Sequence, residues 1–94
     1  MMEQLSFFGR DERDIIRDDL VIALLDLNKE YQTMTEDEII KRFERHKNSG
    51  GSFTDGMQIA WWADSITIMT FESGHYEDYT FTHKEIARQI IERR

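Results

Sequence analysis

The chain has 94 residues, no cysteine and a formal net charge of −7. This length suits a single domain covering residues 1–94, and the lack of cysteine excludes disulfides and thiolate metal sites. The negative charge argues against non-specific binding to nucleic acids, because such binding relies on Lys and Arg side chains that neutralise phosphates.

Hydropathy places the protein away from membranes. A membrane-spanning helix needs about 20 apolar residues, and the longest apolar run, residues 20–25, is far shorter. Residues 1–8 lack the basic start and the apolar centre of a signal peptide. We therefore expect a cytoplasmic protein with no membrane partner. Residues 1–9 are expected to form an extended lead-in, with Phe7 and Phe8 packed onto the first helix.

The first predicted helix runs from Arg10 to about Asn28. Apolar residues recur along it at helical spacing, and charged residues occupy the opposite face. The apolar residues that we expect to face the core are Ile16, Leu20, Leu24 and Leu27.

A second helix is predicted from about Glu36 to His46. Thr35 precedes it as the N-cap residue, and Glu38 stands three positions later, which is the spacing of a capping box. The segment 48–51 (Asn-Ser-Gly-Gly) favours a left-handed C-cap. We expect the glycine pair to form a loop and the residues that follow, up to Gly56, to form a turn.

The chain changes character after residue 56 and then predicts strands. Aromatic and β-branched residues dominate, and short turns separate the apolar segments. We expect a three-stranded antiparallel meander, whose strands are residues 57–62, 66–71 and 79–81.

A third helix completes the predicted fold. Thr82 and Glu85 repeat the capping-box spacing, and an apolar stripe of Ile86, Ala87, Ile90 and Ile91 follows. The predicted class is α+β in the order ααβββα, with the three-stranded antiparallel meander packed against the helices. The core is expected to contain Leu20, Leu24, Ile68 and Ile86.

The sequence offers little for catalysis. It contains no thiol nucleophile, no hydrolase elbow and no phosphate-binding or dinucleotide-binding motif. The glycine-rich segment 49–52 follows a predicted helix instead of opening one, so it aims no helix N-terminus at a phosphate. We predict that the protein is not an enzyme and has no cofactor.

One predicted turn gathers groups that can bind a divalent ion, namely Glu72, His75, Glu77 and Asp78. Carboxylates and imidazoles are common metal ligands. Charged residues are also the usual content of an exposed hairpin loop. We predict no metal site, and metal binding by this turn stays an alternative.

The most informative feature is a gap in the positive charge. No Lys or Arg stands between Lys47 and Lys84, whereas that stretch contains the carboxylates of Asp55, Asp64, Glu72, Glu77 and Asp78. Aromatic residues are interleaved with these carboxylates. The predicted sheet region is therefore acidic and aromatic, which suits a basic partner.

The neighbours Trp61 and Trp62 belong to this region. Strand alternation places their rings on opposite faces, and only one face of the sheet can meet the helices. One indole is therefore either exposed or covered by the lead-in or a helix edge. An exposed indole suits a binding surface, because tryptophan and tyrosine are enriched at interface hot spots. The candidate partner-binding residues are Trp61, Trp62, Glu72, Tyr76, Glu77 and Asp78.

Several segments carry a resemblance to a known group of domains. Residues 51–56 contain a Gly-x-Phe-x-x-Gly turn, and residues 79–91 read as an aromatic-Thr strand that leads into a helix of the form Glu-Ile-Ala-x-x-Ile. With the opening at residues 3–8, these segments resemble small domains of unknown function in large multidomain proteins of Gram-positive phages and conjugative elements. Met57-Gln58 stands where those domains often have a basic residue. The resemblance implies an origin in a mobile element and no activity.

These observations leave three hypotheses for the function. The first is a non-enzymatic protein-interaction domain that binds a basic protein, and not nucleic acid, through its acidic aromatic sheet region. The second is a nucleic-acid mimic that inhibits a host nuclease or regulator, which needs carboxylates spaced like phosphates. The third is a winged-helix-like DNA-binding domain, which needs a recognition helix before the wing.

Overall fold

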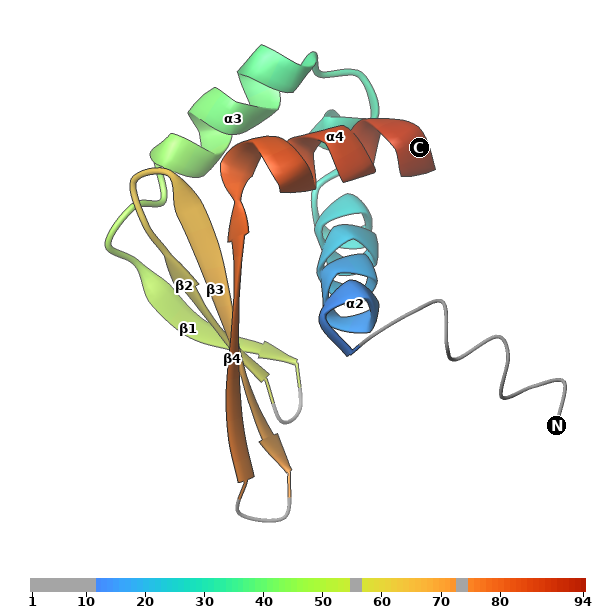
Figure 1. The fold of residues 1–94 in the computed structure, drawn as a ribbon. Helices are drawn as coiled ribbons and strands as arrows, with labels where there is room; N and C mark the ends of the chain where they lie inside the picture. Colours follow the sequence, from blue (N-terminus) through green and yellow to red (C-terminus); the bar gives the residue numbers. More distant parts are fainter. Residues whose placement is uncertain (1–11, 55–56, 73–74) are drawn as a thin grey trace, which may run out of the picture.

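The computed structural model describes residues 12–54, 57–72 and 75–94, and the side chains of residues 52–54, 72 and 75 lie outside this description. The predicted lead-in, with Phe7 and Phe8, also lies outside the described residues. The described elements, in chain order, are α2 (Glu12–Leu27), η1 (Lys29–Gln32), α3 (Glu36–Glu44), β1 (Gly50–Thr54), β2 (Met57–Trp61), β3 (Ser65–Glu72), β4 (His75–Thr82) and α4 (His83–Arg93) (Figure 1). This arrangement confirms the α+β class. The predicted strand number is wrong, because the described sheet has four strands.

The helix α2 buries one apolar stripe, formed by Ile16, Leu20, Val21 and Leu24. Glu12 and Asp14 lie in its first turn, where carboxylates suit the positive end of the helix dipole. Leu27 was expected in the stripe but is 71% exposed. Its spacing fits the stripe, yet it is the last residue of the helix, and the chain turns into η1 just beyond it. Burial needs a covering element as well as the right spacing.

The helix α3 begins at the predicted capping box. The Thr35 hydroxyl accepts a hydrogen bond from the Glu38 N–H at 3.2 Å, and the Glu38 carboxylate accepts one from the Thr35 N–H at 2.8 Å. Hydrogen bonding to Thr35 lowers the pKa of Glu38, because it favours the charged form. The helix ends at Glu44, earlier than predicted. Asn48 then adopts a φ of 67°, which confirms the left-handed conformation indicated by the sequence.

The strand β1 occupies the segment for which the sequence predicted a loop. It pairs antiparallel with β2, so that Gly50 lies opposite Ala60 and Gly51 opposite Ile59. A Cβ atom at Gly50 would stand 3.1 Å from the Ile59 carbonyl oxygen, so glycine lets the two strands approach closely here. Glycine weakens a strand on local propensity alone. Pairing with β2 overrides that propensity, which is why the sequence pattern missed this strand.

The sheet is an antiparallel meander in the order β1-β2-β3-β4. Alternate residues of each strand point to opposite faces. On one face, paired residues form the rows Trp61-Ile66-Phe81 and Ile59-Ile68-Tyr79, which we call the inner face. On the other, the outer face, they form the rows Ala60-Thr67-Thr80 and Gln58-Met69-Asp78.

The helices lie on the side of the inner face (Figure 1). The predicted core residues Leu20, Leu24, Ile68 and Ile86 are confirmed, with at most 4% exposure. Tyr31 of η1 is also buried, although the sequence pattern did not indicate it. The helices and the inner face therefore share one hydrophobic core.

The helix α4 starts directly at the end of β4. The Thr82 hydroxyl accepts a hydrogen bond from the Glu85 N–H at 3.1 Å, which confirms the predicted cap. A closed capping box would direct the Glu85 carboxylate to the Thr82 backbone, but Arg13 of α2 binds it instead, at 3.2 and 3.3 Å. Arg13 also donates to the Thr80 carbonyl at 2.8 Å, and its guanidinium lies 4.4 Å from the centre of the Phe81 ring. Arg13 thus joins α2 to the junction of β4 and α4.

Candidate functional site

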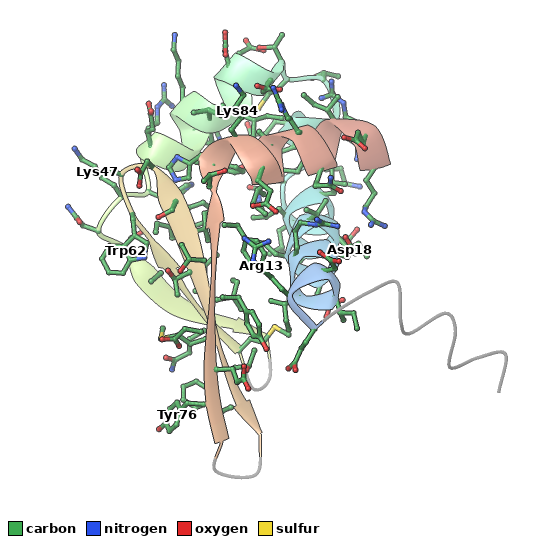
Figure 2. The ribbon with its side chains drawn as sticks, viewed as in Figure 1. Arg13, Asp18, Lys47, Trp62, Tyr76 and Lys84 are labelled. Carbon is green, nitrogen blue, oxygen red and sulfur yellow. The ribbon has the colours of Figure 1, made fainter. Side chains whose placement is uncertain are left out.

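The two adjacent tryptophans differ sharply in exposure. Trp61 is 9% exposed, whereas Trp62 is 47% exposed. Figure 2 shows Trp62 on the side of the sheet away from α2. The sequence left open whether one indole is exposed or covered, and in the structure Trp62 is the exposed one.

Trp61 belongs to the core. It lies opposite Ile66 in the sheet register. Its ring centre stands 5.4 Å from that of Phe43 on α3 and 4.8 Å from that of His46. These contacts bury the indole between the sheet and α3, so Trp61 does not belong to an accessible surface.

Trp62 is held in place by hydrogen bonds on the outer face. Its Nε1–H donates to the Thr67 hydroxyl at 2.8 Å, and that hydroxyl lies 3.0 Å from the hydroxyl of Thr80. The ring is therefore fixed before any partner arrives. A pre-ordered side chain loses less conformational entropy on binding than a free one.

A second aromatic group occupies the other end of the outer face. Tyr76 is 71% exposed and lies opposite Phe71 in the register of β3 and β4. The two rings meet edge to face with centres 4.7 Å apart. Figure 2 shows Tyr76 projecting from the same side of the sheet as Trp62. Both ends of this face therefore present an exposed aromatic ring.

The neighbouring carboxylates Glu77 and Asp78 are divided between the two faces. Asp78 lies opposite Met69, on the outer face, whereas Glu77 lies opposite Thr70, in phase with the inner face. The Tyr79 hydroxyl donates to the Glu77 carboxylate at 3.0 Å. Burial and the carboxylates of Glu77 and Glu12 raise the pKa of Tyr79, so it stays protonated and remains a donor. Asp78 is the carboxylate that faces outward with the aromatic rings.

The remaining candidate, Glu72, pairs with His75 next to the hairpin turn, but both side chains lie outside the described residues. The metal alternative rests partly on these two. Its other members, Glu77 and Asp78, point to opposite faces and do not converge on one ion. Within the described part of the chain, no group of three His, Asp or Glu side chains is placed to hold a metal ion.

The structure thus places Trp62, Tyr76 and Asp78 on one face of the sheet and Trp61 and Glu77 on the other. It adds residues that the sequence analysis did not single out. Their signal was the strand period, because they alternate with buried residues of β3 and β4 and stand in phase with Asp78. We call the combined set the outer-face site: Trp62, Thr67, Met69, Phe71, Tyr76, Asp78 and Thr80.

The charge of the outer-face site is negative. Asp78 is its carboxylate, and the sequence places no Lys or Arg between Lys47 and Lys84. Lys47 lies near the Trp62 end, because the following Asn48 donates its N–H to the Trp61 carbonyl at 2.8 Å (Figure 2). A cation from a partner is therefore attracted at Asp78, whereas near Trp62 the positive charge of Lys47 opposes that of the exposed Asp64.

The two other hypotheses gain less support from these positions. The strand β1 occupies residues 50–54, where a winged-helix domain would need a recognition helix. A nucleic-acid mimic needs a row of free carboxylates, but two of those on α2 are ion-paired: Arg17 binds Asp14 at 3.5 Å and Asp18 at 3.3 Å, and Arg93 binds Asp18 at 3.2 Å. Both remain hypotheses without a structural feature that favours them.

Comparison with known proteins provides no further guide. No family model matches the chain, and no curated protein or solved structure matches it. Among the helices that the structure describes, none is both long and apolar enough to cross a membrane. The function must therefore be argued from the outer-face site itself.

Proposed function

We propose that the domain is a non-enzymatic protein-interaction module that binds a basic protein partner through the outer-face site. The observation that carries the proposal is the half-exposed indole of Trp62, fixed by Thr67 on the face of the sheet opposite the helices. This ring does not contribute to the core, so it is available to bind a partner.

The aromatic content of the site supports this role. Trp62 and Tyr76 lie at the two ends of the face, Phe71 lies beside Tyr76, and Met69 lies between the two ends on β3. Exposed apolar surface of this kind marks interaction sites, and tryptophan and tyrosine supply much of the binding energy of protein interfaces. The site therefore has the composition of an interface centre.

The charge of the site supports a basic partner. Asp78 lies on the edge strand β4, between the two aromatic ends of the face, within a protein of net charge −7. A negative field speeds the approach of a positively charged partner and repels phosphate backbones. A partner with a basic surface therefore fits better than a nucleic acid.

The proposal is tested by photo-crosslinking in the source cells. A photoreactive amino acid replaces Met69 on the outer face and, in a control variant, Ile22, which is exposed on α2. We expect a protein with a basic surface to be captured from position 69 and not from position 22. Capture of the same proteins from both positions would contradict the proposal, as would tight binding of duplex DNA by the wild type at physiological salt.

The kinetics of the captured partner provide a second check. Asp78→Lys is expected to slow association, and the effect should fade as salt screens the charge. Trp62→Ala is expected to speed dissociation by about tenfold or more, because a desolvated aromatic anchor governs residence time. Surface plasmon resonance at two salt concentrations measures both rates. Unchanged rates in both variants would place the interface elsewhere.

A further inference from the structure

The groups of the outer-face site are spread along the two sides of β3: Trp62 follows the end of β2, and Asp78 and Tyr76 belong to β4. Trp62 bonds to Thr67, Asp78 lies opposite Met69, and Tyr76 lies opposite Phe71. Successive positions on one face of a strand are about 7 Å apart. Thr67, Met69 and Phe71 therefore follow one another at steps of about 7 Å. Beside them the face presents an indole, then a carboxylate, then a pair of aromatic rings.

This spacing limits the shape of the partner segment. Residues four apart on a helix are separated by about 6 Å along its axis and lie on one side. A helix laid along β3 can therefore place three side chains at positions i−4, i and i+4 over the three groups. An extended strand can match the spacing with positions i−2, i and i+2, so spacing alone does not decide between them.

The backbone decides in favour of the helix. An added strand gains its affinity from main-chain hydrogen bonds at the edge of a sheet. A segment laid over β3 finds none, because β3 already pairs with β2 on one side and with β4 on the other, and the edges of the described sheet, β1 and β4, lie to either side of it. Layered folds cover an open sheet face with helices, as α2 and α4 do on the inner side of this sheet (Figure 1).

The charges fix the order of side chains on that helix. A cation fits at the central position, over Asp78, since no Lys or Arg of the sheet competes for this carboxylate. At the Trp62 end, Lys47 offsets the carboxylate of Asp64, so a cation is favoured less there than over Asp78 (Figure 2). Apolar side chains fit at the two outer positions, against Trp62 and against the pair of Phe71 and Tyr76.

We propose that the partner presents an amphipathic helix along β3, with Lys or Arg at position i and apolar residues at i−4 and i+4. This inference rests on the proposed function and specifies the occupant of the outer-face site. The strand β3 has eight residues, so it is about 26 Å long and is matched by a helix of about 17 residues.

Three synthetic peptides test this inference on the full-length protein. The first is a 17-residue Ala/Gln-based helix with Leu, Arg and Leu at positions 5, 9 and 13, which is about the length of β3. The second has Glu in place of Arg. The third is extended, with Leu-Thr-Arg-Thr-Leu between prolines. Fluorescence anisotropy of each labelled peptide measures its affinity, and circular dichroism verifies that each protein variant is folded.

We expect the Arg helix to bind the wild type about tenfold or more tightly than the Glu helix or the extended peptide does. Asp78→Lys is expected to reverse the preference between the two helices, which is a result that a merely structural role of Asp78 does not produce. Trp62→Ala is expected to weaken the Arg helix by about tenfold or more. In the matched control Ile22→Ala, on α2, the affinity is expected to stay the same.

The possible outcomes distinguish a failure of this inference from a failure of the proposed function. If the extended peptide binds more tightly, or the Arg helix shows no binding while the partner crosslinked from position 69 does bind, the helix inference is overturned and the interaction face stands. If the partner's own rates are unchanged in Trp62→Ala and Asp78→Lys, both are overturned. A homodimer that Trp62→Ala dissociates would also overturn the inference, because a second copy would then occupy the face.

Discussion

The inner and outer faces of the sheet come from the same strands but meet different surroundings. On β3, Ile66 and Ile68 are fully buried, while the intervening Thr67 and Met69 are only partly buried. Each face has an indole, so aromatic content does not distinguish them. The difference is that helices cover one face and leave the other open. Strand alternation offers two faces, and helix placement decides which one becomes core.

The largest test of this difference compares the two tryptophans. Trp61→Ala is expected to lower the free energy of unfolding by about 3–5 kcal/mol, because it leaves a cavity against Phe43. Trp62→Ala is expected to cost less than about 1 kcal/mol, because its ring is half exposed and its hydrogen bond can be replaced by water. Urea unfolding followed by circular dichroism measures both. Equal losses would show that both rings belong to the core.

A smaller effect is expected at Thr82, the N-cap residue of α4, where the chain passes from β4 into the helix. Thr82→Ala leaves the N–H groups at the start of α4 without their side-chain acceptor and is expected to cost about 0.5–2 kcal/mol. Thr82→Ser keeps the hydroxyl and serves as the matched control, with most of the stability retained. A Ser variant as unstable as the Ala variant would assign the loss to the methyl group instead of the cap.

The third test concerns His83, a buried titratable residue at the start of α4. It is 3% exposed, and its ring centre lies 5.5 Å from that of Phe43. Among the described residues, neither ring nitrogen has a hydrogen-bond partner of ordinary geometry. Burial lowers the pKa of His83, although the nearby backbone of Ser65 and the carboxylates of Glu44 and Asp64 oppose this shift. The folded protein therefore favours the neutral ring.

This shift makes the stability depend on pH in one direction. Above about pH 6.5 the ring is neutral in both states and contributes no pH dependence. As the pH falls through that value, the unfolded chain takes up the proton first, so the folded state loses stability until the folded His83 is also protonated. In urea titrations from pH 7 to pH 5, we expect the free energy of unfolding of the wild type to fall relative to that of His83→Phe. A constant difference over that range would refute the shift.

The helices were the most predictable part of the fold. Their ends are set by local chemistry, such as the capping box at Thr35, and their buried sides by spacing. The strand β1 was not predictable locally, because Gly50 and Gly51 form a strand only against β2. The prediction that Leu27 faces the core was wrong for a related reason, since its exposure depends on where neighbouring elements end.

The candidate site was predictable in its parts but not in its grouping. Alternation showed that Trp61 and Trp62 point to opposite faces, yet the sequence could not say which face the helices cover. Charge alone groups the adjacent carboxylates Glu77 and Asp78 into one acidic region, although alternation places them on different faces. Charge and aromatic content identify a segment, whereas a surface is defined only when the packing of the helices is known.

The bridge made by Arg13 has a consequence for the way the chain is made. This residue bonds to Thr80 and Glu85, which follow it by 67 and 72 residues. On the ribosome α2 emerges before β4 and α4, so its apolar stripe cannot pack against them until Glu85 has left the exit tunnel. Contacts between such distant segments also slow folding, because a long loop must close before they form. The apolar stripe of α2 therefore stays without these partners until α4 has emerged. During that interval, chaperones that shield apolar segments can act on the nascent chain.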